Sequence, residues 1–225
     1  MHPIALRAIE TDDPLDELVR AVYAPDGPIA AAGFQIRPQQ VEISVDIATA
    51  MMRDRGWTLH QAPTGVGKSF SYLLPGVLEA LRAEAKIKAS EDPSRPFRRV
   101  LVSTANIALQ DQIVSKDVPM IARLFGVEVR ASIQKSVSNY ICRKSVDNFD
   151  GIDPDVKRLV DWSKWSNGDR EGIEWDAGPA WGRVSRSSDD CLGPSCEHYR
   201  LGSETPCFWR LAQRATVGAH VIVTN

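Results

Sequence analysis

Apolar residues recur at helical spacing in two segments near the start of the chain. Residues 14–23 (PLDELVRAVY) show this spacing, and residues 26–33 (DGPIAAAG) interrupt it with two glycines and a proline. The second helical segment, residues 37–55, has a broad apolar face formed by Val41, Ile43, Val45, Ile47, Ala48 and Met51. Gly56 then ends this helix. The pattern predicts a helical N-terminal part, with residues 1–33 as a lead-in.

A different pattern follows, in which short apolar runs alternate with helical segments. Residues 57–62 (WTLHQA), 100–104 (VLVST) and 219–225 (AHVIVTN) are predicted strands, the last two of them buried. One helix is predicted to begin near Gly67 and to kink or break at Pro75-Gly76. Another is predicted to begin at NIALQDQIV, after the strand at 100–104. Strands that alternate with helices predict an α/β fold with a parallel sheet.

The composition changes after residue 133. Residues 134–212 are polar and contain all four cysteines and five tryptophans (162, 165, 175, 181 and 209). We interpret this segment as a separate small domain, whose tryptophans pack its core or stack on nucleic-acid bases, with packing favoured. Residues 34–133 would form the main α/β domain, and residues 213–225 would return the chain to it.

Composition excludes several classes of protein. The 225 residues are 43% hydrophobic and 25% charged, with a net charge of −2. No apolar run approaches the roughly 20 residues of a membrane span, and the N-terminus lacks the features of an export signal. We therefore expect a cytoplasmic protein with no membrane partner. In a reducing compartment, cysteines are metal ligands or free thiols more often than disulfides.

Residues 62–69, APTGVGKS, match a phosphate-binding loop except that Ala62 stands at the first glycine position. Gly65 and Gly67 would let backbone N–H groups point at phosphate oxygens, in a loop completed by Pro63, Thr64 and Val66. Lys68 would neutralise the β and γ phosphates, and Ser69 would hold Mg²⁺. A chance glycine-rich turn is the alternative, which the upstream strand and the downstream helix disfavour.

The four cysteines are Cys142, Cys191, Cys196 and Cys207, with 48, 4 and 10 residues between them. This spacing differs from the two Cys-x2-Cys pairs of a zinc ribbon. Four thiolates suffice for one iron-sulfur cluster. From spacing alone, iron-sulfur and zinc are equal alternatives, and free core thiols are a weaker third. His198 lies beside the middle pair and is interpreted as a neighbour rather than a ligand.

Three segments together resemble motifs of superfamily 2 helicases: FQIRPQQ (34–40), APTGVGKS and VLVSTANIALQDQ (100–112). The resemblance implies that Gln40 recognises adenine, with Phe34 and Arg37 beside it, so that ATP is the expected nucleotide. It also implies that Thr104, Asn106 and Gln110 contact the backbone of single-stranded DNA. Helix capping is the alternative role for Thr104 and Asn106, and a solvated helix face is the alternative for Gln40.

The sequence KSVSNYICR (135–143) resembles the KGRSNYLC segment that opens the iron-sulfur domain of DinG-type helicases, relatives of XPD. Ser136-Val137 replaces Gly-Arg, and the interval before Cys207 is longer than in that family. The resemblance implies a RecA-like P-loop domain with an inserted, mostly helical domain that holds a [4Fe-4S] cluster on the four cysteines. It also implies ATP-dependent 5′ to 3′ movement on single-stranded or forked DNA, and a role in DNA repair.

The sequence contains no DEAH box, whose carboxylates hold Mg²⁺ and orient water in these enzymes. The resemblance also implies a second motor domain, which these residues do not supply. We therefore expect the chain alone to bind ATP weakly without hydrolysing it. A non-catalytic ATP- or DNA-binding module with a structural metal site is the alternative, and a P-loop kinase or GTPase with a zinc module is a third. The DNA substrate stays open, including R-loops, forks, quadruplexes, and plasmid, phage or CRISPR partners.

Overall fold

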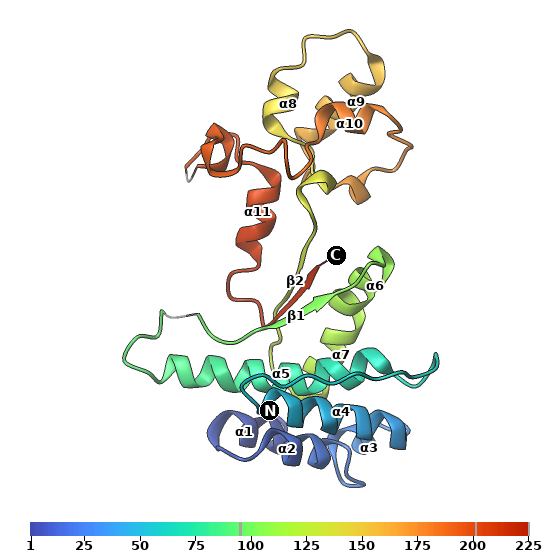
Figure 1. Ribbon diagram of the computed structural model, residues 1–225, viewed down its shortest axis with the longest axis vertical. Helices are drawn as coiled ribbons and strands as arrows, with labels where there is room; N and C mark the ends of the chain where they lie inside the picture. Colours follow the sequence, from blue (N-terminus) through green and yellow to red (C-terminus); the bar gives the residue numbers. More distant parts are fainter. Residues whose placement is uncertain (95, 201, 225) are drawn as a thin grey trace. The chain divides into compact units, whose positions relative to one another are not determined.

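The computed structural model describes residues 1–94, 96–200 and 202–224, which divide into two compact units (Figure 1). Unit 1 comprises Met1–Ile133 and Gly218–Val223, and unit 2 is formed mainly by Gln134–Val217. The chain therefore leaves unit 1 at the residue where its composition changes, and later returns to it. In these described ranges, no helix has both the length and the apolar character needed to cross a membrane.

Unit 1 contains helices and a small sheet. Its elements are α1 (Pro3–Glu10), α2 (Leu15–Val22), α3 (Pro28–Ala31), α4 (Pro38–Met51), α5 (Lys68–Lys88), β1 (Val100–Ser103), α6 (Ile107–Gln112), a π-helical turn η1 (Ile113–Asp117), α7 (Val118–Phe125), β2 (Ala131–Gln134) and β3 (Val221–Thr224). The predicted helix at 37–55 is confirmed as α4, and the predicted helix after residue 106 is confirmed as α6 with its continuation.

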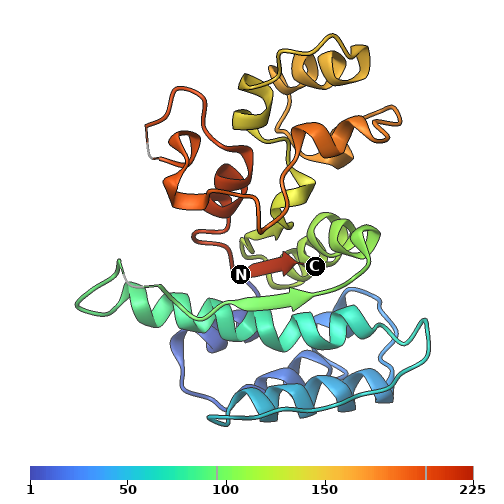
Figure 2. The ribbon, with the colours of Figure 1, turned by 45° about the horizontal axis from the view of Figure 1, so that its top comes forward.

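The three strands form one parallel sheet with the order β1-β3-β2. The arrows of β1 and β3 run side by side in the same direction (Figure 2). β3 confirms the strand predicted at the end of the chain, although Asn225 lies outside the described residues; Val221 and Val223 are fully buried. β1 confirms the strand predicted at residue 100, but the expectation that it is buried is wrong, because Leu101 is 67% exposed. An α/β fold is thus present, with a sheet of three strands.

Helix α5 lies between the sheet and the layer formed by α1, α2 and α4 (Figure 2). The hydrophobic core of unit 1 joins these layers, and even its four-residue elements contribute apolar side chains to it, such as Ile29 of α3 and Val221 of β3. Leu18, Leu73, Leu78 and Ile121 are completely buried in it. Burial of such side chains stabilises each of them by roughly 1.5–3 kcal/mol. The N-terminal segment therefore contributes to the same core as the sheet.

Of the kink or break expected at Pro75-Gly76, the break is not present, because α5 is continuous for 21 residues. The glycine at position 76 inside this helix has a packing reason. A Cβ atom at this position would lie 2.6 Å from Cγ2 of Val100, so the glycine allows α5 to approach β1 closely. Pro75 and Gly76 are both buried, and packing in the core compensates for the poor helix propensity of proline and glycine.

The strand expected at residues 57–62 is wrong. This segment is irregular, and none of its backbone groups is hydrogen-bonded to the sheet in the described part of the chain. Trp57 and Leu59 are 82% and 88% exposed. Their alternation with polar residues imitates a strand, but a strand also needs a paired neighbour, and no sequence pattern supplies one. Conversely, β2 had no clear sequence signal.

Unit 2 is mostly helical. Its elements are α8 (Arg143–Asp147), α9 (Pro154–Ser163), α10 (Ala180–Val184), α11 (Phe208–Ala215) and short 3₁₀ turns at Val137–Asn139, Arg170–Gly172, Gly193–Ser195 and Glu197–Tyr199. Its own core contains Tyr140, Ile141, Leu159, Trp162 and Trp181. Two of the five tryptophans are therefore core residues, whereas Trp165 is 75% exposed.

Candidate nucleotide pocket and four-cysteine site

The glycine-rich loop connects the irregular segment to α5, and its conformation depends on two glycines. Gly65 and Gly67 have φ values of 87° and 89°, a region that side chains with a Cβ atom rarely adopt. Gly67 is the N-cap of α5. A Cβ atom at Gly67 would also lie 2.4 Å from Nε2 of Gln40. The loop therefore places the N-terminus of a long helix beside the Gln40 side chain.

A pocket of about 600 Å³ opens at this loop. Its lining includes most of the residues predicted to bind nucleotide, namely Phe34, Arg37, Gln40, Thr64, Gly65, Gly67, Lys68 and Ser69. The two segments 34–40 and 62–69 are distant in sequence, and the fold brings them together. Ala62, Pro63 and Val66 belong to the loop without lining the pocket.

Hydrogen bonds connect the two segments. Nη1 of Arg37 donates to the carbonyl of Gly65, and Nε2 of Gln40 donates to the carbonyl of Gly67 at 3.2 Å. Nζ of Lys68 donates to the carbonyls of Ala62 and Pro63 at 2.9 and 3.0 Å. Since the Gln40 amide nitrogen contacts the loop, its recognition of adenine stays a prediction. The Lys68 ammonium lies within the loop that it is predicted to serve.

Sequence reasoning missed the opposite wall of the pocket. Gln112 from the end of α6, Asp117 from the π-helical turn and Met120 from α7 line it. Asp117 is 8% exposed and accepts a hydrogen bond from Nε2 of Gln112 at 3.2 Å. Burial raises the pKa of the nearby Tyr72, against a side-chain hydrogen bond with Ser69, and the Asp117 carboxylate raises it further. A π-helical turn changes the 3.6-residue register, so periodicity does not reveal which of its side chains face the pocket.

The residues predicted to contact DNA lie at the start of α6. Asn106 is its N-cap, with Oδ1 accepting from the backbone N–H of Leu109 at 3.3 Å, and Oγ1 of Thr104 accepts from the N–H of Asn106 at 3.2 Å. Gln110 is completely buried, and its amide has no hydrogen-bond partner among the described residues. Asn106 thus caps α6 and Thr104 bonds the backbone of this cap, whereas the Gln110 side chain is buried.

The four cysteines line one cavity of about 210 Å³ in unit 2. All four are free and half-buried. Burial raises the pKa of the Cys207 thiol, backbone hydrogen bonds from Arg210 and Trp209 oppose this, and the neighbouring Cys142 and Cys191 raise it further. Within the described ranges, no three His, Cys, Asp or Glu side chains approach one another closely enough to hold a single metal ion. The four thiols thus share one cavity.

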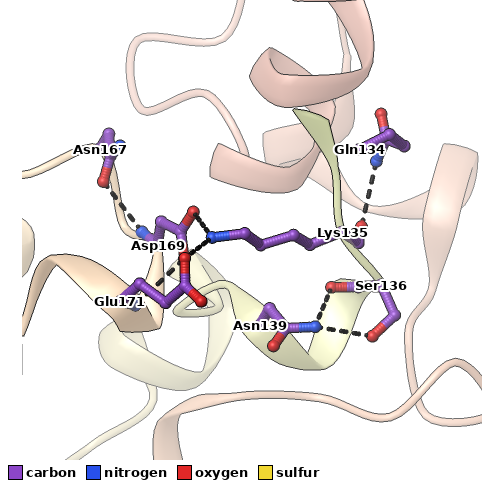
Figure 3. Close-up of polar contacts among 7 residues, drawn as sticks. All are labelled: Gln134, Lys135, Ser136, Asn139, Asn167, Asp169 and Glu171. Atoms are coloured by element: carbon purple, nitrogen blue, oxygen red, sulfur yellow. Dashed lines mark hydrogen bonds and ion pairs between the residues drawn. The ribbon is translucent and has the colours of Figure 1, made fainter. Parts of the chain in front are cut away.

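The segment that carries Cys142 is fixed by a buried lysine. Nζ of Lys135 binds Oδ2 of Asp169 at 2.6 Å and also the carboxylate of Glu171 (Figure 3). Lys135 is 4% exposed. Ser136 and Asn139 form a hydrogen-bonded turn between this lysine and the cysteine (Figure 3). The sequence drew attention to this segment by its resemblance, but it gave no indication that Lys135 has two acidic partners.

Backbone contacts continue this fixation up to Cys142 itself. The N–H of Ile141 donates to the carbonyl of Gly168 at 2.8 Å, and the N–H of Cys142 donates to the carbonyl of Val184 at 2.6 Å. His198 is buried beside the cavity, with Nδ1 3.0 Å from Oγ1 of Thr205 and Nε2 3.1 Å from Oδ2 of Asp147. Nδ1 thus has a hydrogen-bond partner, whereas Nε2 is near the Asp147 carboxylate but forms no hydrogen bond with the described residues, so the role of a neighbour stays a prediction.

Comparison with known proteins identifies the relatives. The ATP-dependent DNA helicase YoaA of Escherichia coli is 31% identical over 217 residues, which cover 90% of this chain and 30% of the relative. The ATP-dependent DNA helicases DinG of Salmonella typhimurium and Escherichia coli are 31% and 30% identical over 218 residues, covering 85% of this chain and 28% of each relative. The chain is homologous to the DinG and YoaA helicases. A scan against protein-family models gives no match.

The chain spans less than a third of the length of these helicases. The homology confirms the resemblance to DinG that the sequence motifs indicated. The matched region covers 90% of this chain and therefore extends into both units.

Proposed function

We propose that this chain is the ATP-binding and single-strand DNA-binding portion of a DinG-like, 5′ to 3′ DNA helicase. The observation that carries the proposal is the pocket at the glycine-rich loop, where segments 34–40 and 62–69 meet. Its residues have the chemistry that a nucleoside triphosphate requires: backbone amides at a helix N-terminus, a lysine and a serine. In the full enzyme, ATP binding would be coupled to hydrolysis and duplex unwinding.

Four polar residues of the pocket have defined roles in this proposal. Lys68 exchanges the carbonyls of Ala62 and Pro63 for the β and γ phosphate oxygens, and Ser69 holds Mg²⁺ through its hydroxyl. Arg37 and Gln40 keep the loop in its phosphate-binding conformation through the carbonyls of Gly65 and Gly67. Gln40 also reads adenine through its remaining hydrogen-bonding capacity, beside the ring of Phe34.

A [4Fe-4S] cluster fits the four-cysteine cavity better than a zinc ion. Zinc draws four ligands to within about 2.3 Å of one point, whereas a cubane keeps its four thiolates apart around its own iron and sulfide atoms. The four thiols here line one common cavity of about 210 Å³, which is space that a cluster would fill. Three basic side chains, those of Arg143, Lys144 and Arg186, and one carboxylate, that of Asp190, are among the described residues that line this space, and this balance of charge suits an anionic group.

In the proposal, Cys142, Cys191, Cys196 and Cys207 hold the cluster. When bound, the cluster supplies a covalent cross-link between segments of unit 2 and a site for one-electron transfer. The chain's own residues then order the domain around it, with Lys135 fixing the first ligand and α11 the last. Thr104 and Asn106 would meet the DNA backbone at the start of α6, and RecA-like architecture would place them beside the nucleotide domain's strand ends.

Equilibrium binding of a fluorescent ATP analogue to the anaerobically purified chain tests the nucleotide site. We expect Mg²⁺-dependent binding, competition by ATP more than by GTP, and at least tenfold weaker binding in Lys68→Ala. Lys86→Ala is the matched control, because Lys86 lies on the same helix, forms an exposed ion pair with Asp12 and is remote from the pocket. Equal binding by Lys68→Ala and the control would show the proposal to be wrong.

A further inference from the structure

We infer that Trp209 and Arg143 donate side-chain hydrogen bonds to the sulfur atoms of the bound cluster, and thereby favour its more negative, reduced form. This inference rests on the proposed iron-sulfur function. It assigns positioning and tuning roles to two residues that are not ligands.

The first observation is that two buried N–H groups lack acceptors. Nε1 of Trp209 and Nε of Arg143 are buried and have no hydrogen-bond partner among the described residues. Leaving a buried donor without an acceptor costs roughly 1–3 kcal/mol, so such groups indicate a missing partner. Neither side chain is able to accept a hydrogen bond, so the partner must be an acceptor. Sulfide and thiolate sulfur atoms are acceptors.

The second observation is where these donors lie. Both residues line the cavity that contains the four thiols. Arg143 directly follows Cys142 at the start of α8, and Trp209 is two residues after Cys207 in the first turn of α11. Trp209 therefore presents its indole to the cavity from the helical turn that begins directly after Cys207.

Aromatic contacts hold both donors in place. The ring of Trp209 lies 6.2 Å from that of Tyr199, and the guanidinium carbon of Arg143 lies 3.9 Å from the ring centre of Phe208. The indole of Trp181 behaves differently, because its Nε1 donates to the carbonyl of Ser138 at 2.9 Å. The N–H of Trp181 in the core of unit 2 thus has an acceptor within the protein, whereas the N–H of Trp209 at the cavity has none among the described residues and is free to bind a ligand.

N–H donors and positive charge beside a cluster stabilise the reduced state, because that state carries one more negative charge. Trp209→Phe keeps an aromatic ring and removes only the donor. Arg143→Gln removes the charge, whereas Arg143→Lys keeps the charge and removes the planar fork. Trp165→Phe is the control, since Trp165 is exposed and outside the cavity.

The test begins with iron and acid-labile sulfide per chain in the anaerobically purified protein and its variants, followed by redox titration of the cluster. We expect Trp209→Phe to retain the wild-type iron and sulfide. At a fixed potential its reduced-to-oxidised ratio should fall about tenfold, which corresponds to about 59 mV for one electron. Arg143→Gln should shift the ratio in the same direction, Arg143→Lys less, and Trp165→Phe not at all. Loss of iron to a chelator should be faster in Trp209→Phe.

Three outcomes separate the inference from the proposed function. Wild-type protein with zinc or no metal would remove the proposed cluster, and the inference with it. A cluster whose potential is the same in wild type, Trp209→Phe and Arg143→Gln would overturn the inference alone. Reduced iron content in Trp209→Phe, with an equal loss of thermal stability in its cluster-free form, would assign packing rather than hydrogen bonding to this ring and also overturn it.

Discussion

At the scale of single residues, His220 belongs to neither candidate site and is completely buried just before β3. Its Nδ1 accepts from the backbone N–H of Arg130 at 3.1 Å, and its Nε2 lies 3.0 Å from Oε2 of Glu84. Nη2 of Arg130 binds the other Glu84 oxygen at 2.5 Å. The network therefore connects α5 with the residues that lead into β2 and β3.

This network predicts acid sensitivity of unit 1. Burial alone would raise the pKa of Glu84, but hydrogen bonds from His220, Arg130 and Lys88 lower it from 4.5 to about 2. Burial lowers the pKa of His220, against the opposing effect of Glu84. A lowered carboxyl pKa gives stability that is present above pH 4.5 and lost as pH falls toward 2, and a lowered histidine pKa acts in the same direction below 6.5.

We expect Glu84→Gln to lower the free energy of unfolding by about 2 kcal/mol at pH 7 and to flatten its decline between pH 5 and 3. Urea unfolding monitored by circular dichroism at several pH values would measure both effects. Glu79→Gln is the control on the same helix, because Glu79 only approaches Arg98 at 3.7 Å. An unchanged acid slope in Glu84→Gln would contradict the assignment.

Residue-level reasoning from sequence succeeded where chemistry and spacing coincide. The homology confirms the resemblance that rested on the loop at 62–69 and the segment before Cys142. Sequence reasoning could not identify Asp117 or Lys135, because their importance depends on partners that only the fold brings close. Asp117 binds Gln112 across a π-helical turn, and Lys135 binds Asp169 and Glu171. An isolated lysine or aspartate in a sequence usually indicates a solvated surface.

At the scale of elements, the segment from Lys135 to Cys142 has almost no regular structure, and ion pairs and hydrogen bonds fix it. Lys135 lies at one end, the indole of Trp181 binds the Ser138 carbonyl in the middle, and Cys142 binds Val184 at the other end. Removal of one partner of a buried ion pair is costly, because the remaining charges stay unpaired.

We expect Lys135→Met to destabilise unit 2 by about 3 kcal/mol and to reduce the iron retained on purification, because Asp169 and Glu171 would then face each other without a cation. Thermal unfolding and iron content would be compared with Lys164→Met, which removes only an exposed pair with Asp161. Adding Asp169→Asn and Glu171→Gln to Lys135→Met should restore part of the stability. No difference between the two lysine variants would contradict this role.

Element prediction depended on how much of each element is encoded locally. Helix α4 and strand β3 were predictable, because continuous apolar patterns mark them. The strand at 57–62 was wrong and β2 was missed, because pairing with other strands decides what a four-residue segment becomes. The continuity of α5 through Pro75 likewise depends on close packing against Val100, which is 24 to 25 residues away.

At the scale of the whole molecule, each compact unit contains one candidate site. The nucleotide pocket lies in unit 1, and the four-cysteine cavity lies in unit 2. The sequence contains a lysine and a serine for the phosphates, but no DEAH box. Phosphoryl transfer requires charge stabilisation and an oriented water in addition to binding.

We therefore expect these 225 residues to bind ATP without turnover. Phosphate release, measured with and without single-stranded DNA, should equal the background given by Lys68→Ala. Retention of fluorescent ATP in the same preparation would show that the pocket is intact. ATP hydrolysis above background that disappears in Lys68→Ala would show that this chain supplies its own catalytic carboxylates.

The hydrogen bond of 2.8 Å from the His220 N–H to the Arg130 carbonyl makes the stability of the sheet depend on unit 2. It joins chain positions on either side of the whole of unit 2, so forming the sheet closes a loop. For a flexible loop of roughly eighty residues, the entropic cost of closure is about 4 kcal/mol. A folded insertion has already lost most of that freedom. Folded unit 2 would therefore lower the entropic cost of pairing β3 with the rest of the sheet. Unfolding of unit 2 would raise that cost and weaken the sheet even though no side chain in the sheet had changed.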